Sequence, residues 1–494
     1  MTSIWDASTL PQLDTAHGPP PEECDVVVVG AGVVGLSAAV RLARAGRRVA
    51  VVADGEPGGG TTGRSTGKLT LLQGTRLSQV RHGALLEVAG AYLQAGRVGL
   101  DWLAALGLPE GEAWRTAPAY TAATTEDGAA KVQAEFETAS ALGLPVQRAD
   151  ASESPFPAEL VVRLDGQLMA DPMVLVARLV EEAVAAGAIF VTGCRATRVE
   201  VDGDLVHLTT ERGSLRAGHA IIATGSPIVD RGGDFARLKA SRSRVAVFRV
   251  PSGTLRGMHL TVDAEPRSLR PVTRDGVDYL LAAGSASVVG RAHSTAALAE
   301  ELQAAVLERF PEAEPMAAWA AQDYESLDGA PYAGPVGSSG RIHVATGFGK
   351  WGLTVGAAAA LAVAEGILDH RPDWADRLFD RRPTLGDAAT AISWNAQVAG
   401  RLVSGLASSA VIGDRELEEG EGRVEVDGVH PVAVSRVDGT ERKVSAICTH
   451  LGGVLAWNDA ECSWDCPLHG SRFAADGRRL EGPAERDLEP RDRP

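Results

Sequence analysis

Four side chains that commonly bind metal lie in two short groups near the end of the sequence. Cys448 and His450 form a C-x-H pair, and after fifteen intervening residues Cys466 and His469 form a C-x2-H pair. Each pair offers one thiolate and one imidazole. Together they match a [2Fe–2S] centre in which two thiolates bind one iron and two imidazoles bind the other. A zinc site of the Cys2His2 kind is the alternative, although zinc fingers seldom combine these two spacings.

The residues that flank the two pairs, THLGG and PLHGSRF, resemble the cluster-binding loops of Rieske [2Fe–2S] domains. The resemblance covers about residues 411–488. It implies that the cluster ligands are Cys448, His450, Cys466 and His469.

Some loop positions depart from the pattern of many Rieske proteins, which carry a further cysteine in each loop, joined as a disulfide. Here those two positions are Gly453 and Leu468. Ser471 keeps a hydroxyl that can donate to a cluster sulfur, but Phe473 replaces the tyrosine of high-potential members. Because fewer hydrogen bonds to sulfur lower the reduction potential, we expect a value in the lower half of the Rieske range. Cys462 is expected to be a free thiol.

A glycine-rich turn near the N-terminus has the spacing of a dinucleotide-binding motif. Gly30, Gly32 and Gly35 follow an apolar strand at 25–29 and open a helix of small and apolar residues. In a βαβ unit these glycines allow a tight turn, the approach of a pyrophosphate and close packing of helix on strand, and the helix N-terminus stabilises the phosphate charge. Asp54 ends the next strand, where a carboxylate binds ribose hydroxyls.

Three later segments favour FAD over NAD as the dinucleotide. Residues 58–67 form a loop of small and hydroxyl residues, residues 220–225 form a buried strand with an ATG turn, and residues 344–356 place backbone amides before the last helix. Amides there would stabilise negative charge on a reduced flavin. Besides the glycine motif and Asp54, the expected FAD-binding residues are Thr61, Thr62, Arg64, Ser65, Thr224, Gly225, Gly347, Gly349, Lys350, Trp351, Gly352 and Thr354.

With these motifs and the segment DGAPYAGP, residues 20–380 resemble the D-amino-acid oxidase superfamily of FAD enzymes, which includes glycine and sarcosine oxidases. The resemblance implies oxidation of a C–N bond by hydride transfer to the flavin, and contact of the Val199 backbone with adenine. Some members attach FAD covalently through a histidine or a cysteine. Arg64 stands at the histidine position and no cysteine lies between Cys194 and Cys448, so we expect non-covalent FAD.

Two basic residues are candidates for catalysis. Lys350 lies in the glycine loop before the last helix and is expected to face the flavin, the alternative being that it caps the loop. Arg270 lies on a strand of the expected substrate domain, where it could bind a carboxylate through two guanidinium nitrogens. A solvated arginine without a catalytic role is an equal alternative at this position.

The order of elements predicts the α/β class: a Rossmann-like FAD-binding domain with an interleaved antiparallel-sheet substrate domain (α+β), followed by an all-β Rieske domain. We expect the oxidoreductase at residues 1–383, a helical connector at 384–410 and the Rieske domain at 411–494. The expected FAD-binding parts are about 20–84, 150–230 and 330–383, and the substrate-domain parts are about 85–149 and 231–329.

Composition limits the partners that this chain can have. A formal net charge of −16 would repel nucleic-acid phosphates and anionic lipids, so we expect neither nucleic acid nor a membrane as a partner. No apolar run reaches the roughly 18–20 residues that span a bilayer. The N-terminal residues lack the pattern of a secretory signal, and five cysteines are too few for a disulfide scaffold in 494 residues. A cytoplasmic location is expected.

Together the motifs predict an FAD-dependent dehydrogenase that oxidises an amine or amino acid and passes electrons singly through the Rieske cluster to an external acceptor protein. In one alternative, an external donor feeds the cluster and the flavin carries out a reduction or an oxygenation. In another, the flavin reacts directly with O2 and the Rieske domain is structural. An electron-transfer module of the ferredoxin-reductase type would need an NAD(P)H site beside the FAD site, but we expect a single dinucleotide site, at Gly30–Gly35.

Overall fold

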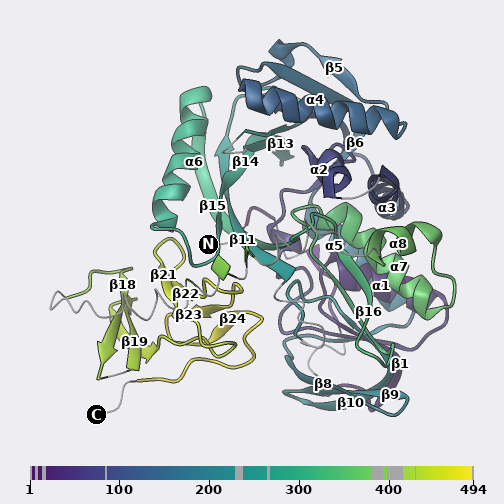
Figure 1. Ribbon diagram of the computed structural model, residues 1–494, viewed down its shortest axis with the longest axis vertical. Helices are drawn as coiled ribbons and strands as arrows, with labels where there is room; N and C mark the ends of the chain where they lie inside the picture. The colour runs from purple at the N-terminus through teal and green to yellow at the C-terminus, as the bar shows by residue number, and fades with distance from the viewer. Residues whose placement is uncertain are drawn as a thin grey trace.

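The computed structural model describes residues 3–5, 9–13, 18–83, 86–228, 237–263, 267–380, 393–394, 396–397, 400, 416–428 and 430–491. Their strands form an eight-stranded sheet, a nine-stranded sheet and two small sheets close to the C-terminus. Figure 1 shows the two large sheets one above the other, with the C-terminal strands beside both. None of the helices in these ranges is long and apolar enough to cross a membrane.

The eight-stranded sheet is built around the predicted βαβ unit. Its main order is β16-β17-β10-β1-β2-β7, and neighbouring strands from β17 to β7 run parallel. All of β2 is buried, as is typical of a parallel strand covered by helices. The strands are β1 (Glu23–Val29), β2 (Val49–Val52), β7 (Ile189–Val191), β8 (Ala196–Asp202), β9 (Leu205–Thr210), β10 (Gly213–Ile222), β16 (Tyr332–Val336) and β17 (Ile342–Thr346). The helices that accompany them are α1 (Val33–Arg44), α5 (Pro172–Ala185), α7 (Ala357–Ile367) and α8 (Asp373–Phe379).

The nine-stranded sheet runs in the order β15-β11-β14-β13-β12-β4-β6-β3, with β5 beside β6. Its neighbours are antiparallel except β12 and β4, which are parallel. The strands are β3 (Lys68–Leu69), β4 (Trp114–Ala123), β5 (Gln147–Ala149), β6 (Leu160–Ala170), β11 (Leu238–Arg249), β12 (Met258–Thr261), β13 (Ser268–Arg274), β14 (Val277–Val288) and β15 (Glu314–Ser326). The helices of this part are α2 (Arg76–Gly83), α4 (Glu126–Ala141) and α6 (Thr295–Arg309), whereas α3 (Leu86–Ala104) packs against α2 on one side and against α7 and α8 on the other.

One predicted boundary differs from the strand pairing. We expected the second FAD-binding part to begin at residue 150, but β6 pairs with β4 over most of its length and so belongs to the nine-stranded sheet. Residues 160–170 therefore lie in the nine-stranded sheet, and the extent of the FAD-binding parts stays a prediction. The pairing joins strands that are far apart in the sequence, so the local pattern of β6 does not reveal it.

The C-terminal domain is all β, as predicted. Its strands are β18 (Gly422–Asp427), β19 (His430–Val437) and β20 (Thr440–Ser445) in one sheet, and β21 (Ala456–Asn458), β22 (Ser463–Asp465), β23 (Arg472–Ala474) and β24 (Arg479–Glu481) in the other. Trp464 and Phe473 are fully buried in its core. The helical connector predicted at 384–410 lies outside the described residues, apart from isolated positions such as Trp394.

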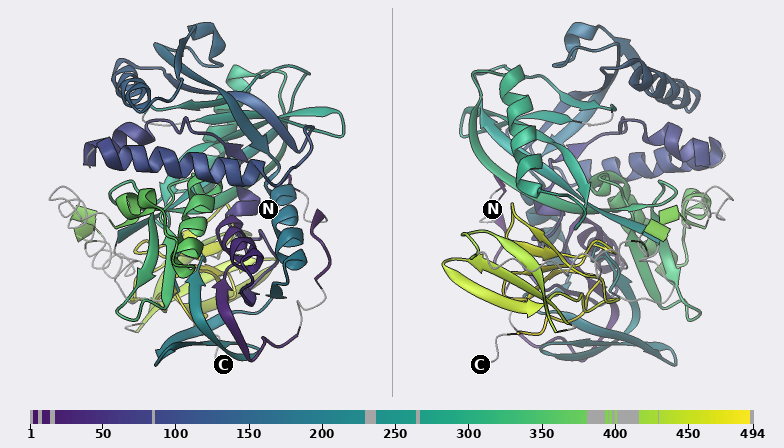
Figure 2. Two further views of the ribbon diagram at one scale, coloured as in Figure 1. Left: turned by 90° about the vertical axis from the view of Figure 1, so that its right-hand side faces the viewer. Right: turned by 60° about the vertical axis from the view of Figure 1, so that its left-hand side comes forward.

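A buried ion network fastens the C-terminal domain to the nine-stranded sheet. Arg242 of β11 pairs with Glu461 and, at 3.2 Å, with Glu481. Arg472 of β23 contacts the same two carboxylates at 3.3 Å and Asp465 at 2.9 Å. The Arg242 and Arg472 side chains are only 4% and 5% exposed. The right-hand view of Figure 2 shows the C-terminal domain, in yellow, directly below this sheet.

The network makes a prediction about stability. Arg242→Ala leaves Glu461 and Glu481 with fewer partners in a place that water hardly reaches, so it should destabilise the protein by about 3–5 kcal/mol. Arg249→Ala on the same strand removes an exposed pair with Glu314 and should cost about 1 kcal/mol or less. Thermal unfolding of both variants, followed at the flavin and cluster absorbances, gives the comparison. Equal losses would contradict the network's role.

Candidate active site

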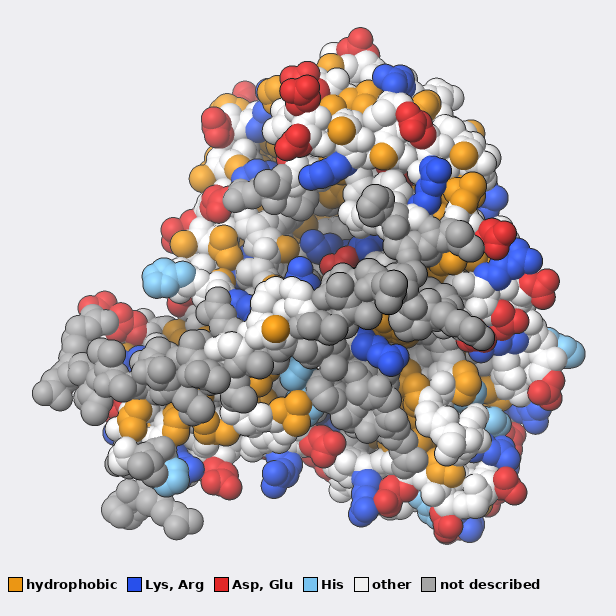
Figure 3. All heavy atoms as spheres, viewed as in Figure 1, with side chains coloured by type: hydrophobic (Ala, Val, Ile, Leu, Met, Phe, Trp, Pro, Cys, Tyr) orange, Lys and Arg blue, Asp and Glu red, His pale blue; other side chains and the backbone are white. Residues whose placement is uncertain are grey.

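A cavity of about 1140 Å³ lies where the three parts of the molecule meet. Its walls come from the glycine motif of β1 and α1, from the loop at 58–66, from strands β11 and β15 and from the turn at 348–353. Residues 460–462 and 479–482 of the C-terminal domain complete the lining. Figure 3 shows a hollow in the molecular surface with basic side chains inside it, between its upper and lower parts. A site walled by all three parts can bring a large cofactor and a substrate together.

The glycine motif has the geometry that a pyrophosphate needs. At Gly30 the φ angle is 108°, and a Cβ there would lie 2.5 Å from the backbone oxygen of Ala223. A Cβ at Gly35 would lie 1.9 Å from the backbone oxygen of Gly30. Gly32, in contrast, lines the cavity, and a Cβ there would meet only the Thr62 hydroxyl, at 3.1 Å. Gly30 and Gly35 are thus required by packing, whereas Gly32 leaves the amide-bearing end of α1 open to an anion.

Most of the predicted FAD-binding residues meet in this cavity. Those that line it are Gly30, Gly32, Asp54, Thr61, Thr62, Arg64, Ser65, Thr224, Gly225, Gly349, Lys350, Trp351 and Gly352. Those outside the lining are Gly35, Val199, Gly347 and Thr354. Ala196 is the one residue of β8 in the cavity lining, and the Val199 side chain is buried. Contact of the Val199 backbone with adenine therefore stays a prediction. Thr354 instead accepts a hydrogen bond from Gln73 at 3.0 Å.

Asp54 lies at the end of β2, on the cavity wall, as expected for a ribose-binding acid. Its carboxylate also accepts a hydrogen bond, at 3.3 Å, from Arg479 of the C-terminal domain. The Asp54 side chain is 59% exposed, so it retains room for another donor. Through this contact the C-terminal domain forms the cavity wall beside Asp54. The glycine motif alone does not reveal this wall.

The two predicted catalytic residues differ in their placement. Lys350 lies on the cavity wall, has a left-handed backbone with a φ of 76°, and donates its backbone N–H to the Asp323 carboxylate. Arg270 does not line the cavity. Its guanidinium is buried and donates to the backbone oxygens of Gly67 and Ala170, at 2.7 and 3.0 Å. Backbone acceptors thus hold one guanidinium nitrogen outside the cavity lining, and binding of a substrate carboxylate by Arg270 stays a prediction.

Lys68 is a cavity residue that the sequence analysis missed. It is buried on β3, and its ammonium donates to the backbone oxygen of His259 at 2.9 Å and to the Ser268 hydroxyl. Burial, with the nearby charge of Arg270, lowers the pKa of Lys68 to about 7. Its place directly after the hydroxyl-rich loop was the available signal. No carboxylate in the described ranges forms an ion pair with it.

The four predicted cluster ligands come together as two pairs. The Cys448 and Cys466 thiols are buried and hydrogen-bonded to each other, and the rings of His450 and His469 lie 5.2 Å apart. The described residues hold no group of three or more that would bind a single metal ion. Two thiols beside two imidazoles fit the donor set of a Rieske [2Fe–2S] cluster.

The two cysteine ligands shift in opposite directions, because the hydrogen bond between the thiols and burial raise the pKa of Cys466. Hydrogen bonds from Cys466, from the backbone and from Ser471 outweigh desolvation and lower the pKa of Cys448 to about 7. Burial lowers the pKa of His469 to about 4, so its imidazole is neutral and can bind iron. A Cβ at Gly453 would lie 2.6 Å from Leu468. The leucine thus fills the space of the disulfide found in many Rieske proteins.

Family comparisons agree with this division of the chain. The FAD dependent oxidoreductase family matches residues 25–366, and the Rieske [2Fe-2S] domain matches residues 408–490. A protein of Bacillus subtilis (strain 168) named as a Rieske 2Fe-2S iron-sulfur protein, YhfW, is 27% identical over 98% of this chain and 96% of its own length. The cytochrome b6-f complex iron-sulfur subunit 1 of a Nostoc species is 40% identical over 17% of this chain and 46% of its own.

Solved structures resemble the larger part of the molecule. Glycine oxidase from Geobacillus kaustophilus matches with a TM-score of 0.59 and 20% identity, over 72% of this chain and 96% of its own. L-Amino acid deaminase from Proteus myxofaciens matches with a TM-score of 0.60 and 15% identity, over 74% and 95%. L-Proline dehydrogenase from P. horikoshii matches with a TM-score of 0.59 and 15% identity, over 72% of this chain and 96% of its own. At these identities the likeness concerns the fold.

The contrast between two glycines gives a test of the nucleotide site. Gly32→Val places a side chain where the backbone faces the cavity, so the protein should fold, keep its cluster spectrum and lose FAD. Gly35→Val drives a side chain into the Gly30 backbone and should instead lower the yield of folded protein. Flavin and cluster absorbance of the purified variants, with circular dichroism, separate the two effects. Loss of both cofactors from a folded Gly32→Val protein would show that the sites are not independent.

Proposed function

Because this chain belongs to the FAD dependent oxidoreductase family and carries a Rieske [2Fe–2S] domain, we propose that it is a dehydrogenase of an amine or amino acid. In this proposal a C–N bond is oxidised and the electrons leave singly through the cluster. Bound non-covalently in the cavity, FAD would supply the hydride acceptor and the cluster a one-electron carrier. The similar structures named for glycine, L-amino acids and L-proline support this substrate class.

The observation that carries the proposal is the docking of a ligand loop on the cavity wall. His469 is 7% exposed, and the next residue, Gly470, packs on β11, where a Cβ would lie 2.3 Å from the Ala240 Cβ. Such contact leaves no room for a side chain between the ligand loop and the sheet. On the other ligand loop, Leu451 beside His450 is 51% exposed, which offers an external redox protein a place to approach.

The chain's own residues would act by binding and by charge. Backbone amides at the turn 348–353, beside Lys350, would stabilise negative charge on a reduced flavin ring. Lys68 would bind the carboxylate of an amino-acid substrate, because its buried ammonium has a third N–H and hydrogen bonds only to neutral acceptors. Burying a cation without a counter-ion is costly, so an anionic substrate group would stabilise it.

Anaerobic mixing of the holoenzyme with a panel of secondary amines and amino acids tests the proposal. A substrate should bleach the flavin first and the cluster afterwards, and the two are followed at separate wavelengths. Bleaching of the cluster only when an external reductant is added would favour electron flow in the reverse direction, from an external donor through the cluster to the flavin. Rapid reoxidation of the flavin by O2, with no change at the cluster, would favour a direct oxidase.

The protonation of Lys68 predicts how carboxylate binding depends on pH. An unreactive carboxylate such as propionate should bind the oxidised holoenzyme below about pH 7 and progressively less above it, because the ammonium loses its proton. The neighbouring groups do not reverse the expected loss of binding as the pH rises, because neither changes its charge near pH 7. Arg270 stays charged, and burial lowers the pKa of His259 to about 4, so that its imidazole is neutral. Titration of the flavin absorbance measures the affinity at each pH. A Lys68→Met protein with the same pH dependence would contradict the assignment.

Removal of a cluster ligand tests the electron exit. His469→Ala should abolish the Rieske signal, because the cluster loses one of its two nitrogen ligands. Substrate should still bleach the flavin in a single turnover, while steady-state turnover with a one-electron protein acceptor falls nearly to zero. His430→Ala, an exposed histidine on β19, is the matched control and should retain both activities. Unchanged steady-state turnover in a variant that lacks the cluster would refute the exit role.

A further inference from the structure

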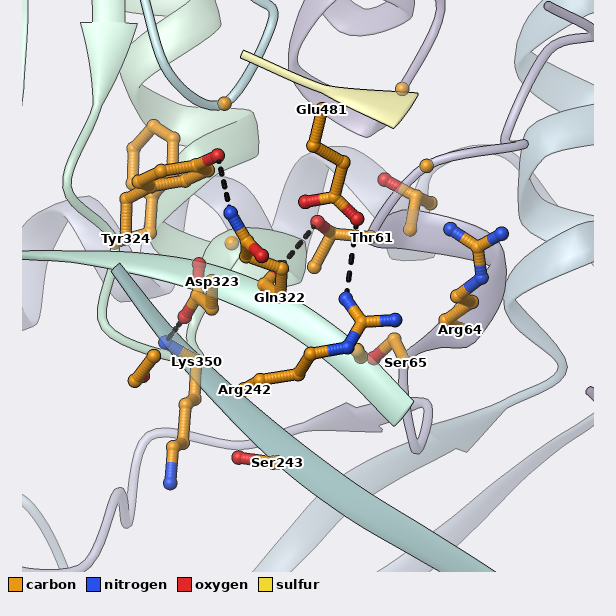
Figure 4. Close-up of a pocket in the computed structure, with 18 of the residues that line it drawn as sticks. Thr61, Arg64, Ser65, Arg242, Ser243, Gln322, Asp323, Tyr324, Lys350 and Glu481 are labelled. Carbon is orange, nitrogen blue, oxygen red and sulfur yellow. Dashed lines mark hydrogen bonds and ion pairs between the residues drawn. The ribbon is translucent and has the colours of Figure 1, made fainter. Parts of the chain in front are cut away.

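Gln322 of β15 touches both the cavity and the loop that holds the cluster. It is 2% exposed and lines the cavity. Its backbone oxygen accepts a hydrogen bond from the Thr61 hydroxyl at 2.7 Å, and its side-chain Nε2 donates to the backbone oxygen of Gly470 at 2.8 Å. Figure 4 shows Gln322 between Thr61 and Tyr324, whose hydroxyl accepts a second bond from Nε2 at 2.8 Å.

Each end of this connection leads to a cofactor site. Thr61 belongs to the hydroxyl-rich loop that lines the cavity beside the glycine motif. Gly470 directly follows His469, one of the two imidazole ligands. A single residue therefore joins the flavin-binding loop to the cluster-binding loop through two hydrogen bonds and its own covalent bonds.

Other contacts between the two parts do not make the same connection. Arg291 donates to the backbone oxygen of Pro467 at 3.0 Å, but it does not line the cavity. Arg242 lines the cavity, but its partners Glu461 and Glu481 lie outside the ligand loops. Gln322 combines a place in the cavity wall with a hydrogen bond to the backbone directly beside a cluster ligand.

We propose that Gln322 is a positioning residue that holds the flavin site and the Rieske cluster in contact, so that electrons tunnel between them along this connection. The proposal rests on the proposed function, in which electrons leave through the cluster. Oxidation of a neutral amine to an imine releases two electrons and two protons. The electrons would pass one at a time along this connection to the cluster and then to an external one-electron acceptor protein, which is reduced twice per substrate, while the protons pass to solvent.

Photoreduction of the holoenzyme tests the connection without a substrate. Under anaerobic conditions, light with EDTA as electron donor reduces the flavin, and the later reduction of the cluster is followed by its absorbance. Gln322→Met keeps the side-chain volume but removes the bond to Gly470, so the cluster phase should slow about 10-fold. The flavin phase, and the cluster signal after chemical reduction with dithionite, should persist.

Gln167→Met is the matched control. Gln167 of β6 is also buried, accepts from the Leu71 backbone N–H and donates to the Asp165 backbone oxygen, but it lies outside the cavity lining. Its loss should lower the midpoint of thermal unfolding and leave the cluster phase unchanged. A purely structural role for Gln322 would make the two variants behave alike.

Gln322→Glu provides a second test if the methionine variant folds poorly. A protonated carboxyl group has one donor and one acceptor, whereas the ionised form has acceptors only. The cluster phase should therefore approach the wild-type rate at low pH and slow as the carboxyl ionises. Wild-type rates at every pH, or in a Gln322→Met protein that holds both cofactors, would overturn the proposal. Because light replaces the amine, this result stands apart from whether the amine panel finds a substrate.

Discussion

Arg242 and Arg472 place two guanidinium groups against the carboxylates of Glu461, Glu481 and Asp465 in a space that water hardly reaches. Each of these charges is stable there only while its partners stay in place, because a buried charge without a partner is costly. The partners come from both sides of the boundary between the domains. The network therefore holds the C-terminal domain in one orientation, and the rest of the site depends on that orientation.

The shape of the cavity follows from this docking. Arg479 and Glu481 of the C-terminal domain line the same space as Gly32 and Asp54 of the nucleotide-binding part. A cofactor that touches both walls binds the docked arrangement and stabilises it in proportion to its affinity. The same docking places Gly470, beside the ligand His469, against β11, which is one wall of the cavity.

Charge is distributed unevenly between the surface and the cavity. The chain carries a net charge of −16, yet Lys68 is a buried cation in the cavity wall without a carboxylate partner among the described residues. Arg76, another cation of the cavity wall, is paired with Glu325 at 3.0 Å. An unpaired cation in a low-dielectric pocket favours an anionic ligand much more than it would in water.

The sequence by itself determined the features that short spacing encodes. The ligand pairs at Cys448 and Cys466 and the glycines from Gly30 to Gly35 each define a local turn, so their residues and spacing predict the fold class, both cofactor types and the part of the cavity wall that the glycines form. Only the tertiary structure decided which side chains meet across the chain. Gln322 contacts Thr61, and Arg270 contacts Gly67, although the members of each pair are hundreds of residues apart in the sequence. Local patterns carry no information about such pairings.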